Sequence, residues 1–486
     1  MFISIDIGTS SIKIILSNPN GEIVKSFRDE IPLHIPQQGA AEHSPNEIYQ
    51  LVLKGVKSIV KGFESSIEAI VFSTYLHGLG MLDAGFNPIS NILTHLDSRA
   101  GRVQSLLEEH GVELYRRTGC PPLFIYPIAK ILWLQKTSGL DVKYISFLKD
   151  YLIYRFTSQK FFTVDYGVAS GSGLLNIYSL RWDDYALSIA GVDEKMLPEV
   201  VEADYVEYIP LDVTAELNIY DRIPLVIGLF DGASMIYGLT GGRSNIAVAN
   251  LGTSAMIRTV IEEPIIDNIN MMRFQTYYFY REKWLSGGAI NNAGIALNTL
   301  IDILTSGLEV DKQRLLNELY NYRFNEDRKP LFLPLIYSER IPFLKTDIGG
   351  SIIGLKPDVK TLDIVASCIE GIAMLLKVIW EALEDNNISI DDVRVGGKLS
   401  GIPFVRTMLA NLFNRKTIWT DIVDVSHLGN ALLAATSLRY SSAKQIRDFI
   451  DYAIAKMFII PEEKYVEKYR ERYQIFKKYL YSLYSS

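Results

Sequence analysis

The stretch Asp6-Ile7-Gly8-Thr9-Ser10 follows the apolar run MFISI, and a matching stretch, Asn250-Leu251-Gly252-Thr253-Ser254, follows the run IAVA in the second half of the chain. A further apolar run comes after each stretch, so each half is predicted to hold a strand, a tight turn and a second strand. Glycine lets such a turn approach an anion, and Thr and Ser offer hydroxyl and N–H donors to phosphate oxygens. Two such turns, one per half, predict that one polyphosphate is held between two related lobes.

Length, charge and cysteine content limit the class of protein. The chain has 486 residues, enough for two sizeable cores, a net charge of −7 and only two cysteines. The net negative charge argues against a nucleic-acid partner, and the two cysteines argue against a disulfide framework. P-loop, zincin and serine-hydrolase motifs are absent from the sequence. Because there is neither a run of about 18 apolar residues nor a leader-like start, we expect a cytoplasmic protein with no membrane partner.

Strand and helix patterns alternate in both halves, which predicts an α/β fold. In the first half we expect a β-meander over residues 1–26, a helix over 45–62, and buried strands over 69–74 and 223–230. In the second half we expect a meander over 244–285, helices near 291–304, 361–385 and 403–414, a strand at VRVGG (393–397), and surface helices within 443–483. The pair Gly241-Gly242 marks a predicted boundary between a lobe of residues 1–242 and a lobe of residues 243–486.

Asp6 ends the first strand, and Asn250 stands at the matching place in the second half. A carboxylate that faces bound phosphates is unfavourable unless a cation intervenes, and Mg²⁺ takes one or two carboxylates together with phosphate oxygens. The change from Asp to Asn in the second copy fits a single Mg²⁺ site at Asp6. The alternative is that Asp6 only caps its own turn. Lys13, on the next strand, is either a phosphate ligand or a solvated surface charge.

Asp231 follows a buried strand and opens a segment of small residues that we expect to be helical. A carboxylate there can take the proton from a substrate hydroxyl as its oxygen attacks a γ-phosphoryl group. The alternative role is a helix N-cap. His77 comes after the strand over 69–74, where ligands bind in open α/β sheets, although a lone histidine is more often structural. Asp97 and Arg99 are two residues apart and of opposite charge, which by itself indicates a local ion pair.

In their order and spacing, these motifs resemble those of the FGGY carbohydrate kinases, sugar kinases of the actin–Hsp70 ATPase superfamily. The resemblance covers nearly the whole chain. It implies two ribonuclease-H-like lobes of the actin/Hsp70 type, each with a mixed sheet flanked by helices, an active-site cleft between them, and ATP and Mg²⁺ as cofactors. The segments that carry it are SIDIGTSSIKIILS (4–17), GAAEHSPNEIY (39–49), LHGLGMLDAGFNPI (76–89), THLDSRA (94–100), GLFDGASMIYG (228–238), ANLGTSAMIR (249–258), GGAINNAG (287–294) and RVGGKLSG (394–401).

The resemblance also implies roles for single residues. Asp231 is the implied catalytic base and a sugar contact, Asp6 the implied Mg²⁺ ligand, and His77 a further sugar contact. The family usually has Trp where His95 stands, which removes an expected stacking surface for the sugar. The implied ligands of ATP are Thr9, Ser10, Lys13, Gly252 and Thr253 at the phosphates, and Gly396 and Gly397 beside the adenosine.

The acceptor is predicted from the segment between His77 and Asn176. The stretch ASGSGLLN (169–176) and Thr94 resemble the gluconokinase branch, with the xylulokinases as the near rival. Gluconate carries a carboxylate that favours a cation in the pocket. The candidate sugar ligands are Asp97 together with Arg99 and Lys130, the last two as cations.

These features predict an ATP-dependent kinase that converts D-gluconate to 6-phosphogluconate. The alternatives are a xylulokinase or another pentulose or polyol kinase and, in a different class, an actin/Hsp70-like nucleotide switch without kinase activity. The resemblance makes a homodimer an expectation as well.

Overall fold

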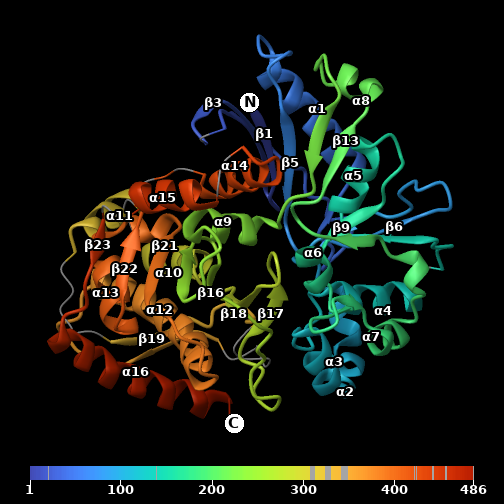
Figure 1. Ribbon diagram of the computed structural model, residues 1–486. Helices are drawn as coiled ribbons and strands as arrows, with labels where there is room; N and C mark the ends of the chain where they lie inside the picture. Colours follow the sequence, from blue (N-terminus) through green and yellow to red (C-terminus); the bar gives the residue numbers. More distant parts are fainter. Residues whose placement is uncertain are drawn as a thin grey trace.

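The structure, a computed structural model, describes residues 1–484 apart from residues 20, 138, 307–311, 323–329, 341–348, 421, 423, 441–442 and 455–456. Figure 1 shows two lobes, one built around a six-stranded sheet and the other around a seven-stranded sheet. Both sheets mix parallel and antiparallel strands and carry helices, which confirms the predicted fold class.

The first sheet has the strand order β13-β14-β5-β1-β2-β3. Its centre is parallel, because β1 pairs with β5 and β5 with β14 in the same direction, whereas β1, β2 and β3 form the predicted meander. The strands are β1 Phe2–Ile7, β2 Ser11–Ser17, β3 Ile23–Glu30, β5 Ala69–Thr74, β13 Val206–Ile209 and β14 Ile223–Val226.

The second sheet repeats this plan, with the order β17-β18-β16-β15-β21-β22-β23. The run β22-β21-β15-β16-β18 matches β14-β5-β1-β2-β3 in order and direction. The meander predicted over 244–285 is interrupted, because β17 lies at the sheet edge and β18 takes the place beside β16. The strands are β15 Ile246–Leu251, β16 Ala255–Ile261, β17 Gln275–Tyr278, β18 Trp284–Ile290, β21 Asp392–Gly396, β22 Lys416–Trp419 and β23 Phe458–Ile459.

Helix α1, Pro45–Val60, matches its prediction and begins where the Ser44 hydroxyl accepts a hydrogen bond from the N–H of Glu47. Strand β14 ends four residues before the predicted end. Gly228, at φ +84°, presses against β5 so closely that a Cβ atom there would lie 1.7 Å from the Phe72 carbonyl oxygen. This close turn aims the chain into α9, Asp231–Thr240.

A large insertion between β5 and β13 adds short strand pairs and small helices to the first lobe (Figure 1). Its helices are α2 Gln104–Glu109, α3 Gly111–Thr118, α4 Pro127–Thr137, α5 Lys149–Phe156, α6 Tyr166–Ser170 and α7 Asp184–Ala190, with α8 Leu211–Glu216 following β13. Its short strands are β6 Gly80–Leu82, β7 Ile92–Leu93, β8 Tyr144–Ser146, β9 Thr163–Asp165, β10 Leu175–Asn176, β11 Arg181–Trp182 and β12 Glu199–Val201, and β7 pairs with β4 Glu42–His43.

The second lobe has a long buried helix, α12, at its core. Helix α16, predicted as a surface helix, lies against α12 and α13 and buries one face with Tyr469, Tyr473, Phe476 and Leu480. The helices are α10 Gly294–Thr305, α11 Lys312–Tyr320, α12 Thr361–Asp385, α13 Pro403–Phe413, α14 Val425–Ser437, α15 Ala443–Ile454 and α16 Glu463–Tyr484, and the lobe also carries the strand pair β19 Leu331–Leu333 and β20 Ser351–Ile353.

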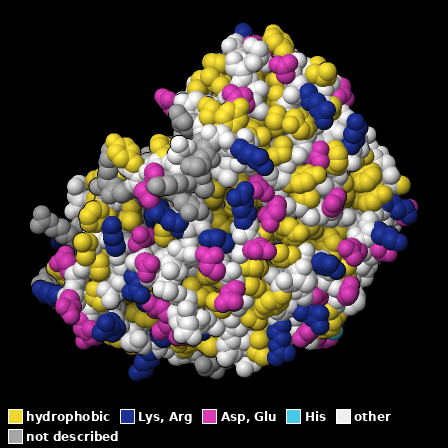
Figure 2. Space-filling model, in the orientation of Figure 1, with side chains coloured by type: hydrophobic (Ala, Val, Ile, Leu, Met, Phe, Trp, Pro, Cys, Tyr) yellow, Lys and Arg dark blue, Asp and Glu magenta, His cyan; other side chains and the backbone are white. Residues whose placement is uncertain are grey.

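The outer surface carries both signs of charge. On the face shown in Figure 2, the Lys and Arg side chains of the described residues are interspersed with Asp and Glu side chains. Within the described parts of the chain, no helix combines the length and the apolar character that crossing a membrane requires.

Helices α9 and α14 join the lobes where they cross, beside β1 and β5 (Figure 1). At the crossing point, a Cβ atom on Gly429 would lie 1.9 Å from the Ser234 carbonyl oxygen, and one on Gly238 would lie 2.3 Å from the Val425 carbonyl oxygen. The Ser234 hydroxyl also donates to the side chain of Asn430 at 2.7 Å. Only glycine permits this approach.

We therefore predict that Gly429→Ala destabilises the protein by about 1–3 kcal/mol or more, because the added methyl group forces the two backbones apart. Gly101→Ala is the matched control, since no atom lies within 4 Å of a Cβ atom built at Gly101. Urea unfolding of both variants measures the difference. Equal midpoints for the two variants would show that the crossing is loosely packed.

Candidate active site

A cleft of about 760 Å³ lies between the two lobes. It is lined by the carboxyl-terminal ends of central strands and by the helix ends that follow them, which is where ligands bind in open α/β sheets. From the first half of the chain its lining includes Asp6, Thr9, Lys13, His77, His95 and Asp231, and from the second half Asn250, Ser254, Arg258, Arg340, Gly396, Gly397 and Ser426.

Asp6, at the end of β1, is held by two hydroxyl groups from different parts of the chain. The Ser73 hydroxyl donates to Oδ1 at 3.1 Å, and the Ser426 hydroxyl donates to Oδ2 at 2.7 Å. Burial raises the pKa of Asp6 above its usual range despite these bonds. Asp6 does not cap its own turn, where the Gly8 N–H donates instead to the Ser11 carbonyl oxygen at 3.0 Å.

Asp231 is the first residue of α9, and the N-cap position belongs to Phe230, which makes no side-chain capping bond. The Asp231 carboxylate accepts one hydrogen bond in the described structure, from the N–H of Gly232 at 2.7 Å. The rest of the carboxylate faces the cleft. The side chain is therefore available to a ligand and is not used as a cap.

The pKa of Asp231 is raised to about 7, first by burial and second by the negative charge of Asp6. The positive charges of Arg258 and Lys149 oppose this rise. A carboxylate whose pKa lies near neutrality is well matched to accept a proton from a hydroxyl group during a reaction.

The two Gly-Thr-Ser turns differ in length, although their sequences match. In the first turn the Gly8 N–H bonds to the Ser11 carbonyl oxygen, and in the second the Gly252 N–H bonds to the Ser254 carbonyl oxygen. The second turn is therefore shorter by one residue. This difference shifts the register of the strand that follows the turn.

The second copy also lacks a cation at the place that Lys13 occupies in the first. Lys13 pairs with Asp6 across β1 and β2, whereas Met256 takes the equivalent place opposite Asn250. Lys13 is not a free surface charge, because it forms an ion pair with Asp424 just before α14. The first turn is thus the charged one.

The structure brings some of the predicted ATP ligands together at the cleft. Gly397, at φ +87°, lies on the second turn so closely that a Cβ atom there would be 2.6 Å from the backbone of Leu251. Only glycine fits this contact, which joins two motifs that are far apart in the sequence. Of the predicted residues, Thr9, Lys13, Gly396 and Gly397 line the cleft, whereas Ser10, Gly252 and Thr253 lie in the turns outside its described lining.

His77 lies at the cleft in a left-handed conformation, with φ at 68°. Its Nδ1 is 2.8 Å from the Gly171 carbonyl oxygen, which can only accept, so Nδ1 carries a proton. Burial lowers the pKa of His77 well below its usual range, and the ring is neutral at pH 7. Nε2 is then a hydrogen-bond acceptor, suited to a substrate hydroxyl group.

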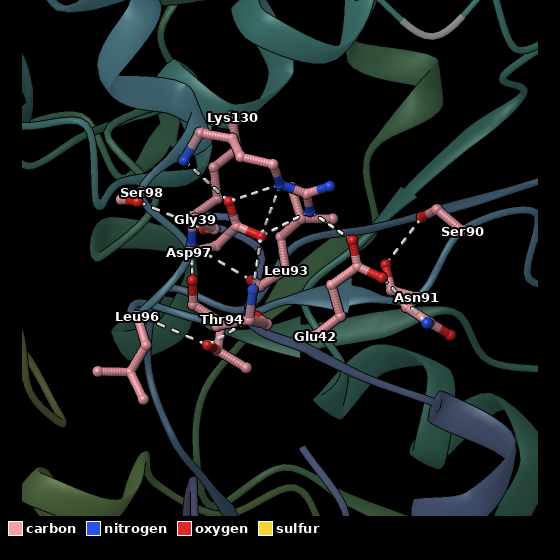
Figure 3. Close-up of polar contacts among 12 residues, drawn as sticks. Gly39, Glu42, Ser90, Asn91, Leu93, Thr94, Leu96, Asp97, Ser98 and Lys130 are labelled. Carbon is pink, nitrogen blue, oxygen red and sulfur yellow. Dashed lines mark hydrogen bonds and ion pairs between the residues drawn. The ribbon is translucent and has the colours of Figure 1, made fainter. Parts of the chain in front are cut away.

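Asp97 and Arg99 form a buried ion pair, and Figure 3 shows Asp97 beside Thr94. The Arg99 guanidinium donates to Asp97 at 2.6–3.1 Å and also binds Glu42. The backbone N–H of Ala41 donates to the same Asp97 carboxylate at 3.1 Å. Both charges are therefore satisfied within the protein.

Lys130 is buried in the same region (Figure 3). Its ammonium donates to three backbone carbonyl oxygens, those of His77, Leu93 and Thr94. Burial lowers the pKa of Lys130 to about 7. Asp97, Arg99 and Lys130 do not belong to the described lining of the cleft, so their roles as direct sugar ligands remain predictions. Lys130 holds the backbone of His77, whereas Asp97 and Arg99 bind the segment of Ala41 and Glu42.

Sequence reasoning missed a buried ion pair behind Asp231. Lys149 donates to Asp165 at 2.5 Å and to the Gly228 carbonyl oxygen at 2.8 Å, and both charged side chains are at most 1% exposed. This pair holds the turn that leads into α9. No local pattern around Lys149 indicated that partner, because Asp165 and Gly228 reach it only through the fold.

Three further cleft residues, His95, Arg258 and Arg340, had no predicted binding role. Arg258 was visible within the segment ANLGTSAMIR, whereas Arg340 lies in no motif. Arg258 lies over the Tyr277 ring, 5.2 Å from its centroid. The cleft therefore carries more positive charge than the sequence indicated.

The carboxylates of the cleft fit a metal ion that arrives with a polyphosphate. Among the described residues there is no group of three or more His, Cys, Asp or Glu side chains that could hold an ion alone. Mg²⁺ needs only one or two protein carboxylates when phosphate oxygens and water complete its coordination. The repulsion between Asp6 and Asp231 is the kind of interaction that such a cation relieves.

Known proteins resemble the chain over nearly its whole length. Models of the N-terminal and C-terminal domains of the FGGY family of carbohydrate kinases match residues 1–238 and 247–438. A gluconokinase from Bacillus subtilis is 28% identical, with 89% of this chain and 86% of that protein covered. A xylulose kinase from Lactococcus lactis is 26% identical, with 98% of this chain and 95% of that protein covered. The crystal structure of a gluconate kinase from Lactobacillus acidophilus has a TM-score of 0.92 at 25% identity, with 100% and 98% covered.

We predict that Lys149→Met destabilises the protein by about 3–5 kcal/mol, because it leaves the buried carboxylate of Asp165 without its opposite charge. Lys143→Met, which breaks an exposed pair with Asp141, is the control and should cost less than about 1 kcal/mol. Chemical denaturation of both variants at pH 7 checks the difference. A similar small loss in both would mean that Lys149 does not support the turn before Asp231.

Proposed function

The chain belongs to the FGGY family of carbohydrate kinases and is an ATP-dependent sugar kinase, and from this premise we propose that it phosphorylates D-gluconate to 6-phosphogluconate. The observation that carries the chemistry is the position of Asp231, which faces a cleft shared with the first Gly-Thr-Ser turn and has a pKa near 7. The gluconate acceptor is supported by the gluconokinase relative and the gluconate kinase structure.

In the proposed reaction, Asp231 orients the terminal hydroxyl of the sugar and takes its proton as the oxygen attacks the γ-phosphoryl group. His77 accepts a hydrogen bond from a second hydroxyl through Nε2. The opposing charges of Arg258 and Lys149 limit the rise in the pKa of Asp231, so that the base is largely ionised above neutrality.

The phosphates are proposed to lie along the first turn, where Thr9 donates and Lys13 exchanges its bond with Asp424 for a phosphate oxygen. Asp6 is the residue proposed to hold Mg²⁺, which when bound would supply positive charge to the phosphate oxygens. The adenosine is proposed to lie beside Gly396 and Gly397. The two lobes come together at this cleft, which excludes water from the transferred group.

A xylulokinase is the second candidate, supported by the xylulose kinase relative. It would use the same base and phosphate contacts with a neutral acceptor. A nucleotide switch without kinase activity is less well supported, because both Asp6 and Asp231 face the cleft. The domain boundary at Gly241-Gly242 and a homodimer also stay predictions.

A substrate panel tests the acceptor. We expect ATP-dependent ADP release with D-gluconate to exceed that with xylulose, ribulose and glycerol in kcat/KM. A coupled ADP assay with the purified protein and Mg²⁺ measures all four. A preference for xylulose would transfer the assignment to the second candidate, and slow hydrolysis unaffected by any sugar would favour a nucleotide switch.

We further predict that Asp231→Asn lowers kcat by a factor on the order of 10²–10⁴ while ATP still binds, since the amide cannot accept the hydroxyl proton. Asp212→Asn, a change in an exposed Asp that bonds to Ser158, is the control and should retain full activity. Turnover assays and calorimetric titration with ATP separate the two effects. Retained turnover in Asp231→Asn would remove the base assignment.

A further inference from the structure

Arg340 of the second lobe reaches the cleft wall that His77 and His95 form from the first lobe. Its backbone N–H bonds to the side chain of Glu339 at 2.9 Å, but its guanidinium makes no hydrogen bond to any described residue. The Nε atom is buried and has no hydrogen-bond partner among the described residues. A buried donor of a charged group without an acceptor is costly, so the site favours a ligand that supplies one.

The adjacent carboxylate cannot supply that acceptor, because its oxygens are already in use. Glu339 accepts hydrogen bonds from the backbone N–H groups of Asn291 at 2.6 Å and Asn292 at 3.2 Å, and from the Asn292 side chain at 2.9 Å. Asn292 also bonds to both backbone groups of Tyr337 at 2.7 Å. These bonds fix the backbone of Arg340 to the turn between β18 and α10 and leave its charge facing the cleft.

The other side chains around Arg340 are neutral or positive. Burial and the charge of Arg340 lower the pKa of His95 to about 3, and both contribute to the low pKa of His77. Arg258 adds a second positive charge, and burial lowers the pKa of Arg340 itself below its usual range. This end of the cleft therefore attracts an anion.

We propose that Arg340 binds the carboxylate of the sugar acid and so selects an acid substrate over a neutral sugar. A guanidinium matches a carboxylate with two parallel hydrogen bonds. The inference rests on the proposed function and names the group that recognises its substrate. Arg99 and Lys130, the cations proposed from the sequence, have their donors committed to the protein.

In this arrangement the substrate spans the cleft. Its terminal hydroxyl lies at Asp231 on the first lobe, and its carboxylate lies at Arg340 on the second lobe. An acid substrate then contacts both lobes directly. A neutral sugar lacks the carboxylate and so cannot make the contact with Arg340. The contact between the carboxylate and Arg340 therefore both selects an acid substrate and draws the two lobes together.

The test compares Arg340→Gln, Arg340→Lys and the control Arg281→Gln, which removes an exposed arginine that pairs with Asp204 and does not belong to the cleft lining. Values of kcat and KM are measured with gluconate and xylulose, and ADP affinity is measured by calorimetry. In Arg340→Gln we expect kcat/KM for gluconate to fall about 100-fold or more, mainly through KM, with xylulose turnover and ADP affinity unchanged. Arg340→Lys should keep part of the preference, and Arg281→Gln all of it.

Several outcomes overturn the proposal. If Arg340→Gln keeps the gluconate preference, another group binds the carboxylate. If it loses ADP or ATP affinity and all sugars equally, Arg340 binds the nucleotide phosphates. If Arg340→Gln does not fold, Arg340→Lys is assayed with gluconate and with gluconamide, its neutral amide. Equal kcat/KM for the two compounds overturns the proposal, because a cation at residue 340 should still favour the carboxylate. A wild-type enzyme that uses only neutral sugars removes the gluconate assignment and this proposal together.

Discussion

The crossing of α9 and α14 brings two helix backbones so close that only glycine fits at Gly238 and Gly429. The rest of the site depends on this contact, because both helices begin at the cleft. Asp231 is the first residue of α9, and Ser426, in the first turn of α14, donates to Asp6. The packing of α9 against α14 therefore accompanies the contact of Ser426, from the second half of the chain, with Asp6 in the first lobe, which also carries Asp231.

The two halves share a topology but carry different charges. The first turn has Asp6 and Lys13, and the second has Asn250 and Met256 at the equivalent places of its paired strands. This asymmetry suits a polyphosphate, because one side can hold a metal and a cation while the other approaches closely through the backbone. Gly397 lies directly on the second turn, so the neutral side is also the tightly packed side.

The sugar end of the cleft shows how burial changes the meaning of a charged residue. Lys130 was a natural candidate for binding a carboxylate, yet its ammonium is used to hold three backbone carbonyl groups. Arg340 lies in no motif, yet its guanidinium faces the cleft and makes no hydrogen bond to a described residue. A charge that is already satisfied shapes a site, and a charge that is unsatisfied can recognise a ligand.

The sequence by itself determined the α/β class, the duplicated strand–turn–strand unit and the start of α1 at Pro45, because periodicity and turn chemistry are local properties. Only the tertiary structure decided that Phe230 is the N-cap of α9, that the second turn is shorter, and which cations are free in the cleft. The physical reason is that hydrogen-bond satisfaction and desolvation depend on neighbours far along the chain, such as the carbonyl groups around Lys130. Local sequence does not contain those neighbours.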